Sequence, residues 1–437
     1  MGYRTANSFE DRHRRSSESG QFNALGEWRL PDDASLSLSG GVSRHDIEAR
    51  GPPDRSRDVG LSGFMRADLK RRRSAARAYW NAGRTMFRDI ASLGGALIFD
   101  YDTYDLELSQ GVALPADNDL VFGLAWRRND ARSQLFTRRV TQDLLAGFAE
   151  NQWRASEHWT AVASLRLDHH EHAGWFLSPR ASLIFSPNAV HTFRGTAGLA
   201  FRNPTLLENH IQTTVVTPGL EQVITGSFDI RPERLQSFEL SHAAELGRVR
   251  TTLTGFQYAL RDIVSATAPA LISAGPPQRF QFGVTNSGAT RAIGAEAAVE
   301  GRVGQNLTLW SNYSYQSLKD ELPSQTTAGS APKHKANAGA RVRRGPWTSN
   351  LWGHWVARTL WRESATTRTT IPDYFILNAF VGWAFSGRLE GFELGLGAFN
   401  LLDAEHYELA PFQDAVRTGQ GGELMRRRLL MTARWRF

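Results

Sequence analysis

The run Asp168-His169-His170-Glu171-His172 is the part of the sequence that most resembles a metal site. On an extended strand, Asp168, His170 and His172 share one face, because successive side chains alternate between two faces. A carboxylate and two imidazoles on one face suit several divalent metals. However, the run lacks a second ligand set and a helical i, i+4 histidine pair. A solvated junction between a strand and a loop is favoured, so we predict no metal or cofactor and keep these three residues as candidates only.

Catalytic chemistry is not indicated elsewhere in the chain. Serine-containing stretches do not combine with histidine and aspartate into a triad, and no Gly-rich segment follows a strand and opens a helix, as a phosphate loop requires. The Gly421-Gly422 pair is more consistent with a flexible loop. The chain contains no cysteine, which excludes disulfides and thiolate metal sites. We therefore expect a protein that is not an enzyme.

The net charge of +7 invites a nucleic-acid interpretation, with basic runs at 70–73 and 426–428. The first run lies where a short turn joins two alternating segments, and the second enters the final strand. Water solvates arginine at the rim or in the lumen of a barrel, which explains both runs without nucleic acid. No nucleic-acid-binding motif accompanies the charge, and we predict no such partner.

The elements that must position these residues are strands with two different faces. In the final strand one side is cationic, with Arg428, Arg434 and Arg436, and the other side is apolar. The apolar side consists of Leu429, Met431, Ala433, Trp435 and Phe437. In the segment that starts at Trp159, charged residues such as Arg166 alternate with apolar ones, and a charged face is costly inside a soluble core. Because no stretch reaches the roughly 18 apolar residues of a membrane helix, we predict an all-β fold, a transmembrane antiparallel β-barrel with lipid outside and water inside.

Turn and loop lengths predict the topology. Short polar turns of the kind that reverse a strand tightly occur, for example, at 31–33, 70–73 and 115–118, and they alternate with longer segments. The longer segments are 46–57, 88–100, 131–141, 172–177, 202–232, 263–286, 319–332, 361–371 and 403–423. Short turns at one end and long loops at the other are typical of outer-membrane barrels. Counting back from the C-terminus gives about nineteen strands, and an odd number does not suit antiparallel closure with both termini on one side.

Short segments from residue 158 onward, and most clearly from 195 to the end, carry a further pattern. They are Leu165–Asp168, Gly198–Glu208, Arg231–Glu233, Ser237–Leu240, Phe256–Tyr258, Arg261–Ile263, Asn286 with Gly288, Gly294–Glu296, Phe399–Asp403 and His406–Tyr407. In order and spacing they resemble the C-terminal part of a TonB-dependent outer-membrane receptor. That resemblance implies a 22-stranded barrel around an N-terminal plug, of which this chain supplies roughly the fourth strand to the last. The chain departs from the family before Arg231, where Gly226–Ile230 replaces the usual Gly-Asn-Pro, and at Gly419–Glu423, which replaces Pro-Gly-Arg.

The N-terminal end resembles none of the family's other parts. Residues 1–19 are polar and charged, without the apolar region of a signal peptide, and no TonB-contacting box or plug precedes residue 17. We therefore expect residues 1–16 to be a polar segment left from an extracellular loop, and residues 17–437 to be an incomplete receptor-type barrel without a plug domain. On this interpretation the chain is an N-terminally truncated fragment, a mis-started reading frame or half of a split gene, and its signal peptide is missing.

The resemblance implies a monomeric receptor in the outer membrane of a Gram-negative cell that imports a ferric siderophore or cobalamin. TonB would power this uptake only if a plug and a TonB box exist upstream. Aromatic and histidine side chains in the outer loops are candidates for ligand contact, although packing within a loop is favoured for any one of them. They are His210, Phe228, Phe280, Trp361 and Phe412. Phe437 has two compatible roles: the resemblance implies a signal to the barrel-assembly machinery, and the alternation implies the last lipid-facing side chain.

Two other functions stay open at this stage. A plugless barrel could act as a passive pore or be an inactive receptor fragment, because so wide a lumen needs a plug. An outer-membrane or soluble β protein that binds carbohydrate is the second alternative. The charged faces of single strands argue against a soluble core, and the absence of a triad argues against an outer-membrane enzyme.

Overall fold

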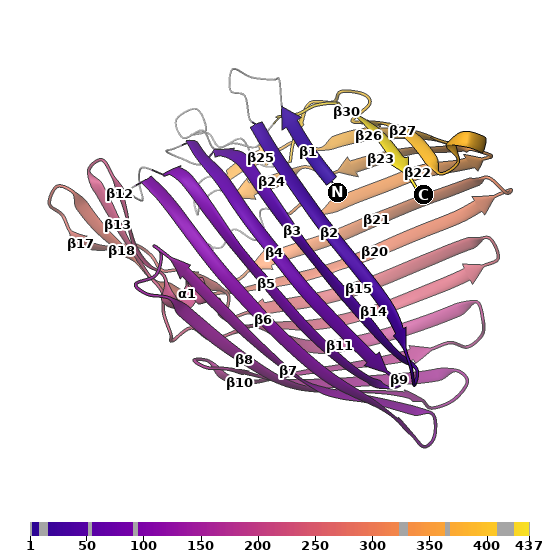
Figure 1. Ribbon diagram of the computed structural model, residues 1–437, viewed down its shortest axis with the longest axis horizontal. Helices are drawn as coiled ribbons and strands as arrows, with labels where there is room; N and C mark the ends of the chain where they lie inside the picture. The colour runs from indigo at the N-terminus through magenta and orange to yellow at the C-terminus, as the bar shows by residue number, and fades with distance from the viewer. Residues whose placement is uncertain are drawn as a thin grey trace.

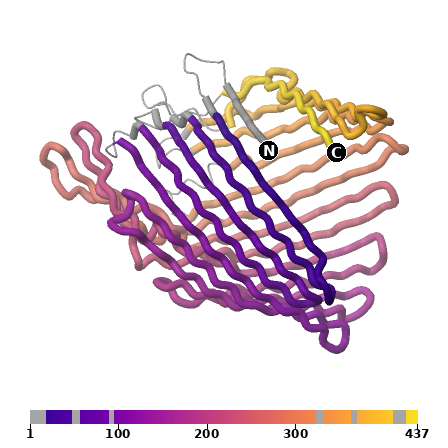
Figure 2. The backbone as a smooth tube through the Cα atoms, in the orientation of Figure 1, coloured from indigo at the N-terminus to yellow at the C-terminus, as the bar shows by residue number. Residues whose placement is uncertain are grey.

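The computed structural model describes residues 2–7, 16–50, 55–90, 95–322, 331–362, 368–408 and 424–436. Its main element is a curved antiparallel sheet of 20 strands that follow one another in chain order (Figures 1 and 2). Within the described residues, β1 and β30 are the edge strands, each paired on one side. The predicted all-β barrel architecture is confirmed.

Two groups of strands make up this sheet. The first eleven are β1 (Gly2–Asn7), β2 (Ser16–Leu30), β3 (Ala34–Arg50), β4 (Arg55–Arg71), β5 (Ser74–Ile90), β6 (Gly95–Leu114), β7 (Asn118–Ser133), β8 (Val140–Arg154), β9 (Trp159–His170), β10 (Gly174–Phe185) and β11 (His191–Arg202). The others are β14 (Glu233–Leu246), β15 (Val249–Arg261), β20 (Ala289–Val303), β21 (Leu307–Asp320), β22 (His334–Arg344), β23 (Trp347–Val356), β26 (Tyr374–Ala384), β27 (Phe392–Phe399) and β30 (Arg428–Trp435). Each expected strand has a counterpart here, and β1 is one strand more than the alternation predicts.

Smaller elements belong to the connections between these strands. They are α1 (Leu206–His210), β12 (Gln212–Thr217), β13 (Leu220–Thr225), β16 (Val264–Ala266), β17 (Ala270–Ser273), β18 (Gln278–Phe282), β19 (Val284–Asn286), β24 (Thr359–Arg362), β25 (Arg368–Ile371), η2 (Gly387–Leu389), β28 (His406–Tyr407) and β29 (Leu424–Met425). β12, β13, β18 and β17 form a four-stranded sheet that projects from one end of the wall (Figure 1). Among the described residues, no helix has the length and apolar character needed to cross a membrane.

The opposite end of the wall is formed by tight turns. The predicted turn at 31–33 separates β2 from β3, and Asp32 and Asp33 there have φ of 59° and 56°. Gly247 has φ of 63° between β14 and β15. This left-handed conformation is open to Gly and better tolerated by Asp than by most residues, which explains the turn chemistry seen in the sequence.

At the loop end, the strands extend further than the alternation predicts. β3 continues to Arg50 and β4 begins at Arg55, and only residues 171–173 separate β9 from β10. The predicted loops at 46–57 and 172–177 are therefore wrong in extent. Beyond the membrane both faces of a strand meet water, so the strand continues through polar residues without the apolar alternation that identifies it.

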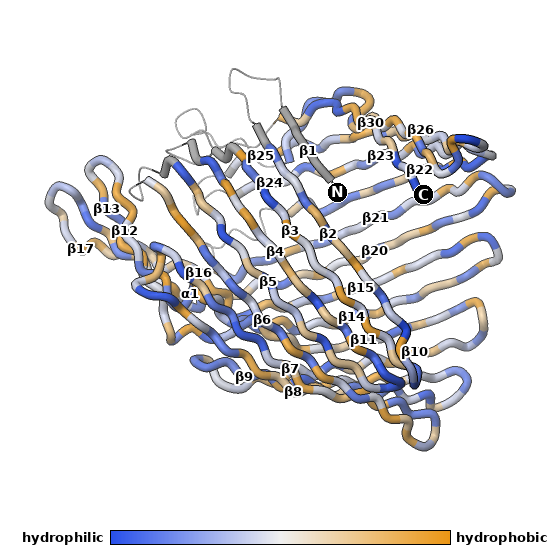
Figure 3. Tube along the Cα trace, in the orientation of Figure 1, coloured by the Kyte–Doolittle hydropathy of each residue, from blue (hydrophilic) through white to orange (hydrophobic). Residues whose placement is uncertain are grey.

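The outer face of the wall is apolar across many strands. Residues directly opposite each other in an antiparallel pair share a face, and one row can be followed from partner to partner through nine strands. The row is Trp28, Leu36, Leu69, Ala76, Leu108, Leu124, Gly147, Leu167 and Leu177. Hydrophobic and hydrophilic residues accordingly alternate along the strands (Figure 3). A continuous apolar row on the outer face is what a lipid-facing surface requires.

The lumen face carries mostly polar and charged side chains, as the sequence predicts. One residue along from the apolar row, the partners are Glu27, Ser37, Asp68, Arg77, Glu107, Ala125, Ala146, Asp168 and Phe176. Several of these charges pair with each other: the Arg77 Nε is 3.1 Å from Asp68 and its Nη1 is 3.6 Å from Glu107. Water in the lumen solvates such pairs, whereas a packed soluble core would not.

Aromatic side chains gather on the outer face near the short-turn end. The rings of Trp159 and Phe185 stack with centroids 4.4 Å apart, and those of Trp347 and Trp383 meet edge-on at 4.2 Å. Such girdles mark the membrane interface in outer-membrane barrels. β10 has 12 residues, which is enough for the roughly 9–11 residues of a tilted spanning strand. The wall therefore has the dimensions and surface of a membrane barrel.

Candidate functional site

The segment after β11 returns over the end of the wall as the short helix α1. Thr205 begins it: the Thr205 hydroxyl accepts from the Glu208 N–H at 3.2 Å, and the Glu208 carboxylate accepts from the Thr205 N–H at 2.7 Å. This capping box satisfies two backbone donors that a helix start leaves free. Leu206 packs beside a buried apolar cluster of Ala131, Phe136 and Val140 in and around the β7–β8 connection.

Arg202, the last residue of β11, joins two carboxylates. Its guanidinium donates to Glu208 at 3.1 and 2.9 Å and to Glu233 at 2.8 and 2.9 Å. Glu233, the first residue of β14, also accepts from the Val264 N–H at 2.8 Å. Burial raises the pKa of Glu208, but hydrogen bonds from Arg202 and Thr205 outweigh it, so that pKa lies below its ordinary value. Arg202 thereby ties α1 to the start of β14.

Asn286 forms a second tie between loops. Its side-chain oxygen accepts from the Arg231 N–H at 2.7 Å, and its amide group donates to the carbonyls of Arg231 at 2.8 Å and Asp262 at 2.7 Å. The Asp262 carboxylate also pairs with Arg231 at 3.1 Å and with Arg234 at 3.3 Å. The two connections that flank β14 and β15 are therefore fixed to each other by one amide.

Asn400 fixes the connection after β27 in the same way. This buried side chain exchanges hydrogen bonds with Ala404, donating to its carbonyl at 2.8 Å and accepting from its N–H at 2.9 Å. The Asn400 N–H donates to the Asn378 side chain at 2.9 Å, and Asp403 accepts from the Arg427 N–H at 2.9 Å. Most of the residues in the three ties, around Arg202, Asn286 and Asn400, lie in segments that carry the sequence resemblance, and here they hold loops in place.

These ties are not apparent from the sequence. The segments 198–208, 231–233 and 399–403 carry the resemblance through their order and spacing, which indicate no role for Arg202, Glu233 or Asn400. The Thr205-x-x-Glu208 spacing of a capping box is visible in the sequence and is the one local signal for α1. Arg202 and Glu233 are 31 residues apart in the chain, and no local sequence pattern indicates that they form a pair.

His170 occupies a structural position. Its side chain is fully buried, and its Nδ1 accepts from the N–H groups of His172 and Ala173, each at 3.2 Å. Its Nε2 lies 2.8 Å from the amide nitrogen of Gln142, which also contacts the Pro204 carbonyl at 3.3 Å. Both ring nitrogens are therefore engaged, and His170 closes the β9–β10 turn from within.

The other two metal candidates, Asp168 and His172, have different contact partners. Asp168 accepts hydrogen bonds from Arg166 at 2.9 and 3.1 Å. β9 ends at His170, so His172 lies in the turn and does not continue the strand face. The predicted set of Asp168, His170 and His172 is thus not the group of ligand atoms that the described structure gathers. The shared strand face on which that prediction depends ends at His170, two residues before His172.

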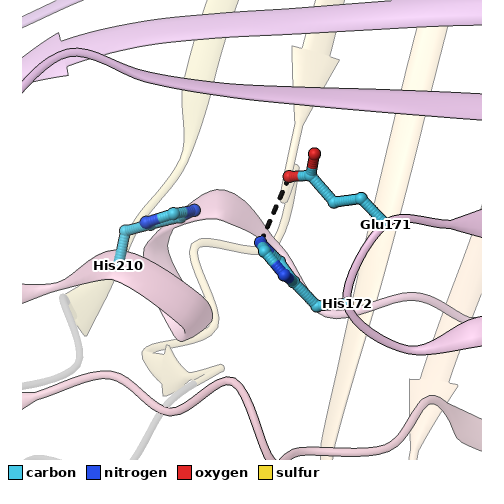
Figure 4. Close-up of side chains that lie close together, drawn as sticks. All are labelled: Glu171, His172 and His210. Atoms are coloured by element: carbon cyan, nitrogen blue, oxygen red, sulfur yellow. Dashed lines mark ion pairs between the residues drawn. The ribbon is translucent and has the colours of Figure 1, made fainter.

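A different group of ligands meets at this place. The ligand atoms of Glu171, His172 and His210 all lie within 4.8 Å of one another (Figure 4). The Glu171 carboxylate is 3.2 Å from the His172 Nε2. Phe228 packs on both imidazoles, with ring centroids 4.6 Å from His172 and 4.9 Å from His210. Burial, and then His172 and Arg138, lower the pKa of His210, so this imidazole is neutral at neutral pH.

Backbone contacts bring Phe228 to α1. The Ser227 N–H donates to the Glu208 carbonyl at 3.0 Å, and the Gly226 N–H donates to the Ile211 carbonyl at 2.6 Å. A Cβ on Gly226 would lie 2.5 Å from the Asn209 carbonyl oxygen, so this approach requires glycine. The segment that departs from the family pattern is therefore the one that seats Phe228 against the two histidines.

The remaining ligand-contact candidates lie elsewhere. Phe280 belongs to β18, which pairs with β13 in the projecting sheet, and Trp361 belongs to β24, which pairs with β25. Of the predicted residues that the structure describes, only His210 and Phe228 are brought together, with ring centroids 4.9 Å apart. Phe412 and Phe437 lie outside the described residues.

The fold and the polar lumen define the class of protein, an outer-membrane β-barrel. A family model described as TonB dependent receptor-like, beta-barrel matches residues 2–401. The chain belongs to this family. The predicted resemblance is therefore confirmed, and the match begins earlier than Leu165, the first residue of the segments that carry the resemblance.

Related proteins agree with this assignment. An iron-regulated outer membrane virulence protein of Vibrio cholerae is 30% identical over 207 residues, which cover 44% of this chain and 30% of the relative. The match thus spans less than a third of that relative's length.

Solved structures share the fold. The siderophore receptor PirA of Acinetobacter baumannii superposes with a TM-score of 0.79 at 14% identity, covering 97% of this chain and 71% of PirA. A ferric enterobactin receptor mutant of Pseudomonas aeruginosa in complex with enterobactin gives 0.77 at 15% identity, covering 96% of this chain and 70% of that one. The copper transporter OprC gives 0.73 at 16% identity, covering 97% and 74%. At such identities the likeness establishes the fold alone.

Proposed function

We propose that this chain is the barrel wall of an outer-membrane receptor that imports a ferric siderophore by a TonB-dependent route. The family match over residues 2–401 is the observation that carries the proposal. The iron-regulated relative supports iron as the cargo. Energy coupling requires a plug and a TonB-contacting segment in the complete receptor. Assembly by the barrel-assembly machinery, a monomeric state and a role for Phe437 stay predictions.

The described contacts support capture at the loop end. Arg202, Asn286 and Asn400 fix the bases of three loops, so the side chains that these loops present are held in place before a ligand arrives. A site whose loops are already ordered loses less conformational entropy on binding. The charged lumen beneath the loops gives a hydrated passage for a polar iron chelate.

Uptake by the complete receptor is the direct test. In a strain without its own siderophore receptors, we expect the receptor to restore accumulation of radioactive iron from at least one ferric siderophore. Arg202→Ala should reduce this accumulation, because it releases α1 from β14. Arg250→Ala is the matched control, since its guanidinium, 70% exposed, pairs with the likewise exposed Glu245 at the short-turn end.

Four other results would contradict the proposed siderophore import. Accumulation of labelled cobalamin, with no iron chelate transported, would replace the siderophore by a corrinoid. Binding of an oligosaccharide alone would favour the carbohydrate alternative. Ligand-independent conductance in planar bilayers, with no uptake of any chelate, would identify a passive pore. Unshifted electrophoretic migration of the refolded, unheated chain would contradict the membrane barrel itself.

A further inference from the structure

We propose that Glu171, His172 and His210 form a binding site for one divalent transition-metal ion of the Zn²⁺ type at the mouth of the barrel. The three side chains come from two separate connections, the β9–β10 turn and the end of α1 (Figure 4). This ion is distinct from the iron chelate proposed as cargo, so the inference goes beyond the proposed function.

The spacing of the ligand atoms fits a metal ion after small side-chain movements. Around a tetrahedral Zn²⁺ with bonds of 2.0–2.1 Å, neighbouring ligand atoms are about 3.3 Å apart. The Glu171 carboxylate and the His172 Nε2 already lie 3.2 Å apart. All three ligand atoms lie within 4.8 Å, and rotation of the exposed Glu171 and His172 side chains can close the remaining distance.

The ligand types select the class of metal. Two imidazoles and one carboxylate are the protein ligands of many zinc sites that keep one position open. Ca²⁺ and Mg²⁺ prefer sets made wholly of oxygen ligands, and this group offers only one carboxylate. Copper and nickel also accept imidazole, and Cu²⁺ ranks above Zn²⁺ in general affinity. The site is therefore one for borderline divalent metals, and Zn²⁺ is the simplest probe.

A buried atom without a partner is the second observation. The Nε2 of His210 is buried and has no hydrogen-bond partner among the described residues, and the same holds for the side-chain nitrogen and oxygen of the neighbouring Asn209. Leaving a buried polar atom unpaired is unfavourable, and such atoms are rare in native structures. A metal ion between His210 and His172 would satisfy the imidazole.

Independent contacts fix the two halves of the site. His170 holds the β9–β10 turn by accepting the N–H groups of His172 and Ala173. Arg202 holds α1 through Glu208. Phe228 packs against both imidazoles and holds them near each other. The ligands are thus supported by surrounding residues that contact no metal themselves, as in established metal sites.

Zinc titration of the full chain, refolded in detergent and freed of metal, tests the proposal. A chromophoric chelator would report the competition. We expect about one tightly bound Zn²⁺, and we expect His172→Ala and His210→Ala each to weaken that binding at least about tenfold. Co²⁺ should give the visible absorption of a tetrahedral site in the original chain and lose it in both variants. Ca²⁺ should not compete.

A second histidine pair provides the matched control. The Nδ1 of His191 lies 3.1 Å from the Nε2 of His242 on the outer face near the short-turn end. His242→Ala should leave tight zinc binding unchanged. Loss of binding in His242→Ala, or unchanged binding in both His172→Ala and His210→Ala, would overturn the proposal.

A folding check and a third variant distinguish misfolding from the loss of a metal-ligating side chain. Each variant is first checked for heat-modifiable migration, and Glu171→Gln, in the exposed turn, provides a variant that should still fold while binding zinc more weakly. Zinc titration uses no siderophore, so failure of iron uptake leaves the metal result intact. Conversely, absence of tight zinc binding in the original chain would refute the metal site without touching the receptor assignment.

Discussion

The Arg202 side chain joins α1 to the start of β14 through hydrogen bonds to Glu208 and Glu233. Replacing it with alanine leaves the carboxylates of Glu208 and Glu233 without their main donors, and Glu233 is nearly buried. We expect the α1 segment to open more easily by about 1–3 kcal/mol. Hydrogen exchange of the amides at 205–211 measures this opening. Arg250→Ala should change nothing in that segment, and equal protection in Arg202→Ala and the original chain would contradict the role.

Glu208 makes the same segment sensitive to acid. Because its folded pKa lies below the ordinary value of 4.5, its ionised form stabilises the folded loop. That stabilisation is fully present above the ordinary pKa and is lost as the pH falls through the folded pKa. We expect the protection of the amides at 205–211, after correction for the pH dependence of intrinsic exchange, to decrease below about pH 4.5. Glu208→Gln should abolish most of this pH dependence, and an unchanged profile would argue against it.

The sequence predicts which face a side chain lies on, but it does not predict which distant residue that side chain contacts. Lumen and lipid faces follow from alternation, because each side chain meets either water or lipid. The run 168–172 was recognisable as a cluster of ligands, but its partner His210 lies 38 positions beyond His172 in the chain. A contact of that kind depends on how a loop folds back, and neither period nor propensity encodes it.

At the scale of elements, each strand should tolerate charge on one face only. Leu165 lies in the middle of β9 on the outer face, and Ser164 faces the lumen beside Glu150. Leu165→Arg should destabilise the barrel in lipid by about 2–4 kcal/mol, because the charge meets the membrane interior. Ser164→Arg should be close to neutral. Urea unfolding in vesicles measures both, and an equal loss in the two variants would contradict the assigned faces.

Strand positions were predictable where one face meets lipid. The alternation locates β2 and β3 but not the residues that extend β3 to Arg50, since both faces of that end meet water. The short strands β12, β13, β17 and β18 follow no membrane pattern, and they lie in two segments, 202–232 and 263–286, that the sequence predicts as long loops. Their pairing depends on contact between two connections, 212–225 and 270–282.

The whole molecule should sit in the membrane at a depth set by its aromatic residues. Trp347 is half exposed on the outer face near the short turns. In vesicles, bromines near the lipid glycerol should quench Trp347 more strongly than bromines near the chain ends. The difference in fluorescence between the original chain and Trp347→Phe isolates this residue. Stronger quenching by bromines near the ends of the lipid chains would contradict the assignment of Trp347 to the membrane interface.

The connection from 203 to 232 leaves the wall and rejoins it beside a single guanidinium. Its tip, the β12–β13 hairpin, lies beyond that tie. Residues added, removed or exchanged within the tip change what the mouth presents to the outside, while the register of β11 on β14 is kept. Because β13 also pairs with β18, an exchange of the tip has to include the partner segment 270–282. The wall and the projecting sheet are thus two separable parts, and sequence change in the second leaves the strand pairing of the first intact.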